Sequence, residues 1–396
     1  MKIVKLSEIC TDIIDCPHST PKWLDKGIPV VRNFNLIDGI IDFSNLSYVD
    51  EETYKVRTRR ANPEEGDIII SREAPMGVVG IVPPNFKCCL GQRLVLLKID
   101  KEKYDPYYVL YALMSKYVQT QIHRVDKTGS IVSNLNIPDL ENLNIPVVDI
   151  MQKEKADILK NIEENIQVNN EIIHKLNHLG DTLYNYYFIQ FALSNEKLVY
   201  SEILKRNIPR WDIVNILEIC DMQKGSEPGS DNYLLNLENN VLPFYRVSDL
   251  DDKKPIYVYY NDKYSFVNYD EVLVSFDGSV GRVGIGFKGF YSSGIKKIVS
   301  LKKEISNGLL YFMFRSEYIK KTIEKYATGT VLKHASSSIP YIFLPYKNTY
   351  YEEFSLKINP IYMEIVNCKK ENDILKEYYN FLLPLIINEQ IQINGG

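Results

Sequence analysis

The stretch GDIIISREAPMGVVGI at residues 66–81 returns in altered form as DEVLVSFDGSVGRVGI at residues 270–285. The match pairs Ser71 with Ser275, Gly77 with Gly281 and Gly80 with Gly284. Similarity of this kind within one chain is typical of a duplicated structural unit. If the duplication is real, further matches must follow in the same order.

Further matches do follow on both sides of this stretch. LSEIC (6–10) matches ILEIC (216–220), and IPVVRNFNL (28–36) matches LPFYRVSDL (242–250), so Arg32 corresponds to Arg246. Downstream, TGS (128–130), IP (137–138) and Pro146 match TGT (328–330), IP (339–340) and Pro345. The chain is therefore predicted to hold two diverged copies of one unit.

Short β-rich runs and an amphipathic stretch recur in each copy. Runs such as GDIIIS, LVLLKI, IYVYY and EVLVSF, bounded by Gly, Pro, Asn and Asp, indicate strands. Apolar residues at helical spacing predict one helix at residues 106–121 and its counterpart at residues 307–326. The expected fold class is α+β, with two similar globules that each combine a curled mixed β-sheet with helices.

Each copy ends in a long stretch with a heptad pattern. Apolar and amide residues separated by alternating steps of four and three predict the seam of a left-handed coiled coil. The first seam comprises Ile158, Ile162, Asn165, Asn169, Ile172, Leu176, Leu179, Leu183, Tyr186 and Gln190, and the second comprises Phe354, Ile358, Ile361, Ile365, Cys368, Asn372, Leu375, Tyr379, Leu382 and Ile386. Each seam spans about 48 Å at 1.5 Å per residue. Pro360 and Pro384 are expected to bend or shorten the second helix.

A helix with one apolar seam must bury it, and we expect the two tails to pair as an intramolecular antiparallel coiled coil. Asn165, Asn169 and Asn372 are expected to fix the register of this pair. The arrangement predicts globules at 1–150 and 193–349, helices at 151–192 and 350–396, and pseudo-twofold symmetry. Ordinary domain-packing helices are the alternative.

Composition indicates a folded cytoplasmic protein without a cofactor. Apolar residues make up 45% and charged residues 25% of the chain, and it has neither a membrane-length apolar run nor a signal peptide. The six cysteines form no C-x-x-C pair, and His174 and His178 lack the glutamate of an H-E-x-x-H site, so we expect buried thiols and no metal. Nucleotide-binding and methyltransferase motifs are also absent, and Gly278, Gly281 and Gly284 are better explained by a tight turn.

The net charge of −4 is unevenly distributed along the chain. The two predicted globules together carry +1, whereas the two tails together carry −5. Any contact with a polyanion is therefore expected on the globules, and its non-specific component should be weak.

Two unequal heads on a rigid spacer suit a ligand with two unequal parts. Duplex DNA has a helical repeat of about 34 Å, so two heads separated by a helical spacer could enter successive major grooves. Heads that have diverged would read an asymmetric site.

At this point the chain resembles the specificity subunit of type I restriction-modification systems over essentially its whole length. The resemblance rests on KLSEICTDIIDCPHSTP, on the paired segments above and on IPVVDIMQKEKADIL, although the second copy reads LPYKNTYYEEFSLKI there. It implies two target-recognition domains that bind double-stranded DNA and no catalytic residues. It also implies partners, namely two methyltransferase subunits and, through them, restriction-translocase subunits.

Side chains that reach base edges or phosphates are chiefly Arg, Lys, Asn, Gln and hydroxyls. Those within the shared motifs are the predicted DNA-binding residues. They are Arg32, Arg57, Arg59, Arg60, Arg72, Arg93, Lys127 and Ser130 in the first copy, and Arg246, Arg282, Lys296, Lys297, Thr330 and Lys333 in the second. Any single one of them could instead be a solvated surface charge.

Three other functions stay open at this stage. The chain could be a scaffold whose duplicated heads bind protein on a coiled-coil spacer. It could serve a system in which modification and cleavage share one polypeptide. An enzyme with its site between the heads is less favoured, because no nucleophile-base set recurs in both copies.

Overall fold

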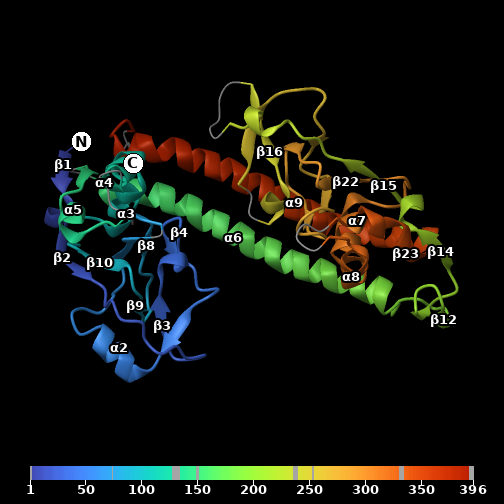
Figure 1. Cartoon of the computed structure of the whole chain (residues 1–396), viewed down its shortest axis with the longest axis horizontal. Coiled ribbons are helices and arrows are strands. Elements are labelled where there is room, and N and C mark those ends of the chain that lie inside the picture. The colour runs from blue at the N-terminus through green and yellow to red at the C-terminus, as the bar shows by residue number, and fades with distance from the viewer. Residues whose placement is uncertain are drawn as a thin grey trace. The chain divides into compact units, whose positions relative to one another are not determined.

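The computed structural model describes residues 2–73, 75–126, 134–148, 151–234, 240–251, 254–329 and 334–391, and the chain divides into two compact units (Figure 1). Unit 1 comprises residues 1–165 and 375–396, and unit 2 comprises residues 166–374. Each unit therefore combines one globule with parts of both long helices.

Unit 1 is built on a four-stranded antiparallel sheet in the order β2-β10-β7-β8. These strands are Cys10–Asp15, Leu94–Ile99, Ile68–Ser71 and Val79–Ile81. A second sheet pairs β3 (Ile28–Val31) antiparallel with β6 (Ser47–Val49) and parallel with β9 (Cys89–Leu90). Two further ladders join β1 (Lys2–Lys5) to β11 (Asn144–Val147) and β4 (Leu36–Ile37) to β5 (Ile40–Ile41).

The helices of this globule are short. They are α1 (Leu6–Ile9), η1 (Asn33–Asn35), α2 (Glu51–Arg57), α3 (Pro106–Met114), α4 (Lys116–Asp126) and α5 (Ile137–Glu141). The Asp105 carboxylate accepts the Tyr108 N–H at 2.9 Å, which satisfies a free donor at the start of α3. Six consecutive residues of α3, Tyr108 to Leu113, are buried, so this helix lies inside the core.

Unit 2 repeats this plan. Its main sheet has the order β15-β22-β19-β20, with strands Cys220–Lys224, Ile295–Ser300, Val272–Ser275 and Val283–Gly284. Its second sheet has the order β17-β16-β21-β18, with strands Ile256–Tyr259, Val241–Tyr245, Gly289–Tyr291 and Phe266–Val267. The remaining elements are β12 (Val199–Ser201) paired with β13 (Arg206–Ile208), β14 (Asp212–Asn215) paired with β23 (Phe343–Tyr346), α7 (Asn307–Arg315), α8 (Glu317–Tyr326), and the 3₁₀ turns η3 (Ile216–Glu218), η4 (Ser230–Asn232), η5 (Val247–Leu250) and η6 (Ser336–Tyr341).

The stretch that revealed the repeat forms the same turn in both units. Ser71 Oγ donates to Pro75 O at 2.7 Å and accepts the Val78 N–H at 2.9 Å. Ser275 Oγ donates to Ser279 O at 2.6 Å and accepts the Arg282 N–H at 2.9 Å. Gly77 and Gly281 occupy the same place in the turn with φ of 82° and 79°, a conformation that favours glycine. The predicted duplication and the α+β fold class are confirmed.

The predicted short helix is in fact two helices in each unit. The break falls at Ser115, between α3 and α4, and at Ser316, between α7 and α8. Each serine has extended backbone, and its hydroxyl donates at 2.6 Å to a carbonyl three residues earlier. Apolar periodicity continues across the break and hides it, because a single capping residue leaves the periodic pattern almost unchanged.

The two long helices are α6 (Gln152–Tyr184), followed by one π-helical turn η2 (Asn185–Ile189), and α9 (Asn348–Ile387). Helix α9 continues through Pro360 and Pro384, so the expected shortening is wrong. Pro360 is exposed and Leu356, four residues earlier, is 73% exposed, so the carbonyl that loses its helical donor can bind water.

All ten residues of the seam predicted for α9 are buried or half-buried. The seam predicted for α6 consists of two sets of positions, each repeating every seven residues, and one of these sets is displaced by one residue. Ile158, Ile162, Asn169, Leu176 and Leu183 are buried or half-buried, whereas Asn165, Ile172, Leu179, Tyr186 and Gln190 are exposed. Leu159, Ile166, Ile173, Gly180 and Tyr187 take the inward positions instead.

The cause of this displacement is visible at Gly180. A Cβ at Gly180 would overlap the ring of Phe312 in α7, so close packing selects glycine at this interface. Hydrophobicity favours Leu179, which is 45% exposed. The inward face of α6 is therefore set by a third helix as well as by its coiled-coil partner.

The two long helices pair antiparallel within each unit. In unit 2, Asn169 bonds to Asn372 at 3.0 Å, whereas the ring of Tyr187 lies 5.3 Å from that of Tyr350. In unit 1, Glu163 interacts with Tyr379, and Leu159 and Ile386 belong to the same buried cluster. The six cysteines are free, and all but Cys10 are buried.

Candidate nucleic-acid interface

Arg32 follows β3 on the surface of unit 1. Its N–H donates to Asn35 Oδ1 at 3.0 Å, which fixes the turn into η1. The guanidinium carbon lies 5.1 Å from the ring centroid of Trp23 and 4.7 Å from that of Phe34. Both rings are exposed, at 38% and 44%. A guanidinium held against two aromatic faces keeps its charge and loses conformational freedom, which prepares it for a planar or anionic partner.

Arg246 occupies the same position in unit 2, with one chemical difference. Its N–H donates to Asp249 Oδ2 at 2.8 Å, and its side-chain Nε lies 3.3 Å from the same oxygen. Asp249 is 2% exposed and corresponds to Asn35 of unit 1. The arginine charge is therefore compensated in unit 2, whereas the residue that caps the turn in unit 1 is a neutral amide.

Three more arginines of unit 1 lie around the loop that follows β2. Arg59 and Arg60 are exposed and line a depression with Asp15 and His18. Arg93 lines a neighbouring depression with His18, Gln92 and Asn134, and its Nε lies 3.2 Å from Glu73. Since His18 lines both depressions, the structure brings Arg59, Arg60 and Arg93 to one region, which we call the unit-1 basic surface.

Arg57 lines the same depression as Arg59 and Arg60, but its guanidinium is committed to internal contacts, and its contact with DNA stays a prediction. It is 7% exposed, and its guanidinium donates to three backbone carbonyls, those of Leu90, Ser19 and Pro17, at 2.8 to 3.3 Å. Arg57 is the last residue of α2 and its side chain is buried, whereas Arg59 and Arg60 come after the helix and are exposed. Arg57 therefore ties three segments of unit 1 together.

Arg72 is also committed to internal contacts. Its side chain is 12% exposed, and Nη1 donates to both Asp15 carboxylate oxygens at 2.8 and 2.7 Å. Nε and Nη2 donate to Leu135 O and Asn134 Oδ1 at 3.0 and 3.2 Å. Every nitrogen of the Arg72 guanidinium therefore has an internal acceptor, and contact of Arg72 with DNA stays a prediction.

The predicted residues of unit 2 are more dispersed. Lys297 is a structural residue, since its Nζ bonds to Glu271 at 2.9 Å and Phe266 O at 3.1 Å with 14% of the side chain exposed. Arg282 pairs with Asp251 at 2.8 Å on the surface. Lys296 lies directly across the strand pair from Lys224, and burial followed by this like charge lowers its pKa. Lys224 and Lys296 together form the unit-2 lysine pair.

Four predicted residues, Lys127, Ser130, Thr330 and Lys333, lie outside the described residues. Several residues near the predicted arginines were missed by sequence reasoning, namely His18, Trp23, Phe34, Gln92, Asn134 and Lys224. Position was the available signal for His18, Phe34 and Gln92, which follow β2, β3 and β9, and for Lys224, the last residue of β15. No such signal marks Trp23 or Asn134. Among the described residues, no group of three or more His, Cys, Asp and Glu could hold a metal ion. Within the same residues no helix is apolar enough over sufficient length to cross a membrane.

Comparison with known proteins relates this architecture to one family. A family model described as "Type I restriction modification DNA specificity domain" matches residues 1–178 and 209–340. The type I restriction enzyme MjaIX specificity subunit of Methanocaldococcus jannaschii is 24% identical over 383 residues, covering 89% of this chain and 85% of that protein. A second protein of that organism, which bears the name of a type I restriction enzyme MjaX specificity subunit, is 29% identical over 319 residues, covering 78% of this chain and 73% of its own length.

A solved structure shares the fold. The crystal structure of the type I restriction-modification system S subunit from M. genitalium aligns with 97% of this chain and 95% of its own length, with a TM-score of 0.56 and 16% sequence identity. The family model covers well over half of the chain in two segments, one for each copy of the repeat. This chain belongs to the family of type I restriction-modification DNA specificity proteins.

Proposed function

We propose that this chain is the DNA-recognition subunit of a type I restriction-modification complex. In this role each globule, residues 1–150 and residues 193–349, reads one half of a bipartite, asymmetric DNA site. Family membership and the duplicated fold support the role.

The observation that carries the proposal is the unequal chemistry displayed on one repeated backbone. Arg32 and Arg246 occupy equivalent turns, but only Arg246 lies against a carboxylate, that of Asp249. The unit-1 basic surface is rich in arginine, whereas the corresponding region of unit 2 displays a lysine pair. Two halves of an asymmetric DNA site need different side chains at equivalent positions, and this difference supports the proposal.

The chain is proposed to be non-catalytic and to act through partners. It recruits two methyltransferase subunits and, through them, restriction-translocase subunits. The globules together carry a charge of only +1, so neutralisation of phosphates contributes little affinity. The isolated chain is therefore expected to bind DNA weakly, and the partners complete the DNA clamp.

Methylome sequencing of the host with and without this gene tests the proposal. Loss of one bipartite methylated motif, restored by a plasmid copy, is the expected result. An unchanged methylome would overturn the proposal in favour of a protein-binding scaffold. Purification of the tagged chain then distinguishes separate methyltransferase and restriction subunits from one polypeptide that carries both activities.

A further inference from the structure

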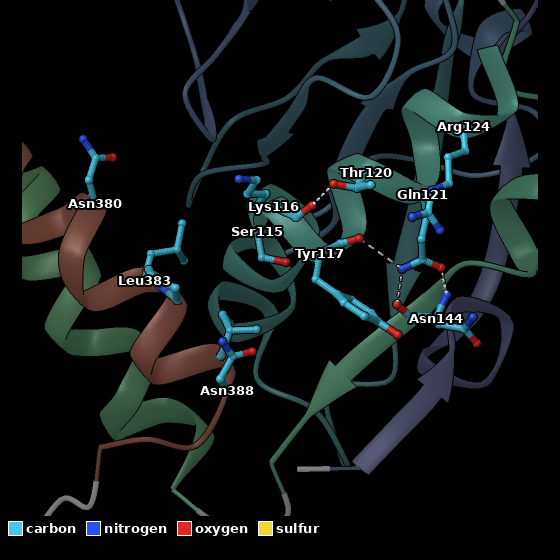
Figure 2. Close-up of a pocket in the computed structure, with 12 residues that line it drawn as sticks. Ser115, Lys116, Tyr117, Thr120, Gln121, Arg124, Asn144, Asn380, Leu383 and Asn388 are labelled. Carbon is cyan, nitrogen blue, oxygen red and sulfur yellow. Dashed lines mark hydrogen bonds between the residues drawn. The ribbon is translucent and has the colours of Figure 1, made fainter. Parts of the chain in front are cut away.

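A groove in unit 1 is lined by none of the described residues that were predicted to bind DNA. It encloses about 690 Å³ between α4 and the last turns of α9, and β11 contributes Asn144. Figure 2 shows Leu383 of α9 and Asn388, which follows α9, on one side, with Tyr117 and Gln121 of α4 on the other. Tyr117 is 45% exposed, so a large aromatic ring is left available at this groove. The volume of the groove lies within the range of protein pockets that bind ligands, and its lining combines apolar and polar side chains as theirs does.

The charges of the groove have one sign. Lys116 and Arg124 are its charged lining residues, and each lies one helical turn from Thr120 on α4. No carboxylate contributes to the lining. Within the described part of the chain, neither cation has a carboxylate at ion-pair distance. A groove of this kind favours an occupant with negative charge.

The equivalent position in unit 2 is covered by another segment of the chain. Ser115 and Ser316 mark the same helix break, so Tyr318 of α8 corresponds to Tyr117. Tyr318 is covered, because it packs against a buried cluster of Phe191, Leu204 and Ile208. Leu204 and Ile208 belong to the β12–β13 hairpin, and Phe191 follows η2. A segment of the chain itself therefore fills this position in unit 2.

The cover in unit 2 also carries a positive charge. The guanidinium carbon of Arg206, in β13, lies 5.1 Å from the Tyr318 ring and 5.4 Å from the Phe191 ring. The residue before Tyr318 is Glu317, whereas the residue before Tyr117 is Lys116. The charge at this helix position is thus reversed between the units. No segment within the described part of unit 1 takes the place of the hairpin.

We propose that the open groove of unit 1 is a docking site for an acidic, apolar segment of a partner protein. The occupant places aliphatic or aromatic side chains against Tyr117 and Leu383, as the hairpin does against Tyr318. Its carboxylates face Lys116 and Arg124. The apolar lining favours a peptide over nucleic acid, because phosphates would leave the apolar surface wet.

The test uses the full chain and a defined peptide probe. The acidic probe is a fluorescein-labelled copy of residues 199–212 in which Lys205, Arg206 and Arg210 are replaced by Glu, and the basic probe is the unaltered copy. Fluorescence anisotropy should show saturable binding of the acidic probe and at least tenfold weaker binding of the basic probe. The double variant Lys116→Glu, Arg124→Glu should weaken the acidic probe at least tenfold.

A matched charge reversal on the other unit supplies the control. The double variant Lys321→Glu, Lys325→Glu changes α8 by the same net charge and should leave the affinity within twofold. Tyr117→Ala should weaken binding without a change in net charge. If the reversal on α4 lowers the thermal midpoint, Lys116→Gln, Arg124→Gln replaces it.

Hydrogen exchange locates the bound probe. Protection of residues 116–124 and 380–388 by the acidic probe supports the proposal. Absence of saturable binding overturns it, as does equal weakening by the two charge reversals. Protection of these residues by a 20-base-pair DNA duplex in place of the peptide would assign the groove to nucleic acid. None of these results depends on which DNA motif the chain reads.

Discussion

Nδ2 of Asn169 in α6 lies 3.0 Å from Oδ1 of Asn372 in α9, and both amides are buried. Asn372 Nδ2 donates in turn to Asn170 Oδ1 at 2.9 Å, and Asn169 Nδ2 also lies 3.1 Å from Glu371 Oε2. This network satisfies two amides that would otherwise lack partners between the helices. It is available in only one alignment of the two helices, so it selects the register of the pair.

Replacing one of these asparagines should cost more than replacing both. Asn372→Leu removes the bonds from Asn372 to Asn169 and Asn170 and leaves Glu371 as the partner of Asn169, and we expect a loss of about 1–3 kcal/mol in unfolding free energy. The double variant Asn169→Leu, Asn372→Leu should recover part of this loss, because two apolar residues can pack together. Urea denaturation of the four proteins in a double-mutant cycle measures the coupling. Additive single effects would show that the two amides act independently.

Glu163 should make stability depend on pH. Tyr111 donates its hydroxyl to Glu163 Oε2 at 2.7 Å, but burial dominates and raises the pKa of this carboxyl to about 7. The folded state therefore binds a proton more tightly than the unfolded state, in which the pKa is about 4.5. The contribution to stability is fully present below pH 4.5 and is lost as pH rises through 7.

Glu163→Gln removes this titration while keeping an acceptor for Tyr111. The difference in unfolding free energy, variant minus natural chain, should be larger at pH 8 than at pH 5 by an amount on the order of 1–3 kcal/mol. Thermal or urea unfolding at both pH values measures the difference. A difference between the two proteins that does not change with pH would exclude Glu163 as the titrating group.

Arg32 and Arg57 should give opposite phenotypes when truncated. Arg32→Ala should weaken DNA binding by the assembled complex by about 1–3 kcal/mol, roughly 10- to 100-fold, with little change in thermal midpoint. Arg57→Ala should lower stability by about 2–4 kcal/mol, because several buried carbonyls lose a charged donor. DNA affinity and thermal unfolding of both variants separate the two roles, and equal effects on either quantity would contradict the distinction.

Gly180→Ala should destabilise unit 2. The added methyl group meets the ring of Phe312, and overpacking of this kind costs about 1–3 kcal/mol. Adding Phe312→Leu should recover part of the loss by making room. Leu179→Ala is the adjacent control, and its effect should be small because Leu179 is 45% exposed. If Leu179→Ala were the more damaging change, the assignment of the inward face of α6 would be wrong.

Sequence reasoning found the features that repeat and missed the features that depend on a third partner. Paired motifs identify equivalent strands and the turns at Ser71 and Ser275. Both turns need a serine hydroxyl that bonds to the backbone, so the same residue type stands at this position in both copies. The heptad pattern identifies the seam of α9 and half of that of α6. The other half required knowledge of Phe312, which lies 132 residues from Gly180 in sequence.

The candidate interface was less predictable for a similar reason. Arg57, Arg59 and Arg60 are alike in sequence, and only the loops that close around Arg57 decide which of them is internal. The compensation of Arg246 by Asp249 could be anticipated, because the two residues lie in one short turn. The stacking of Trp23 on Arg32 could not, because it depends on how a preceding loop returns to the surface.

Unit 1 is assembled from residues 1–165 and 375–396, so its parts are synthesised at widely separated times. During translation the first globule must wait for the end of α9 before Leu159 and the main buried cluster acquire Ile386 and Ile387. Unit 2, which is continuous in sequence, has no such delay. Unit 1, most of which is synthesised before unit 2, is thus completed after it, and loss of a few residues near residue 387 would damage a unit built mainly from residues 1–165.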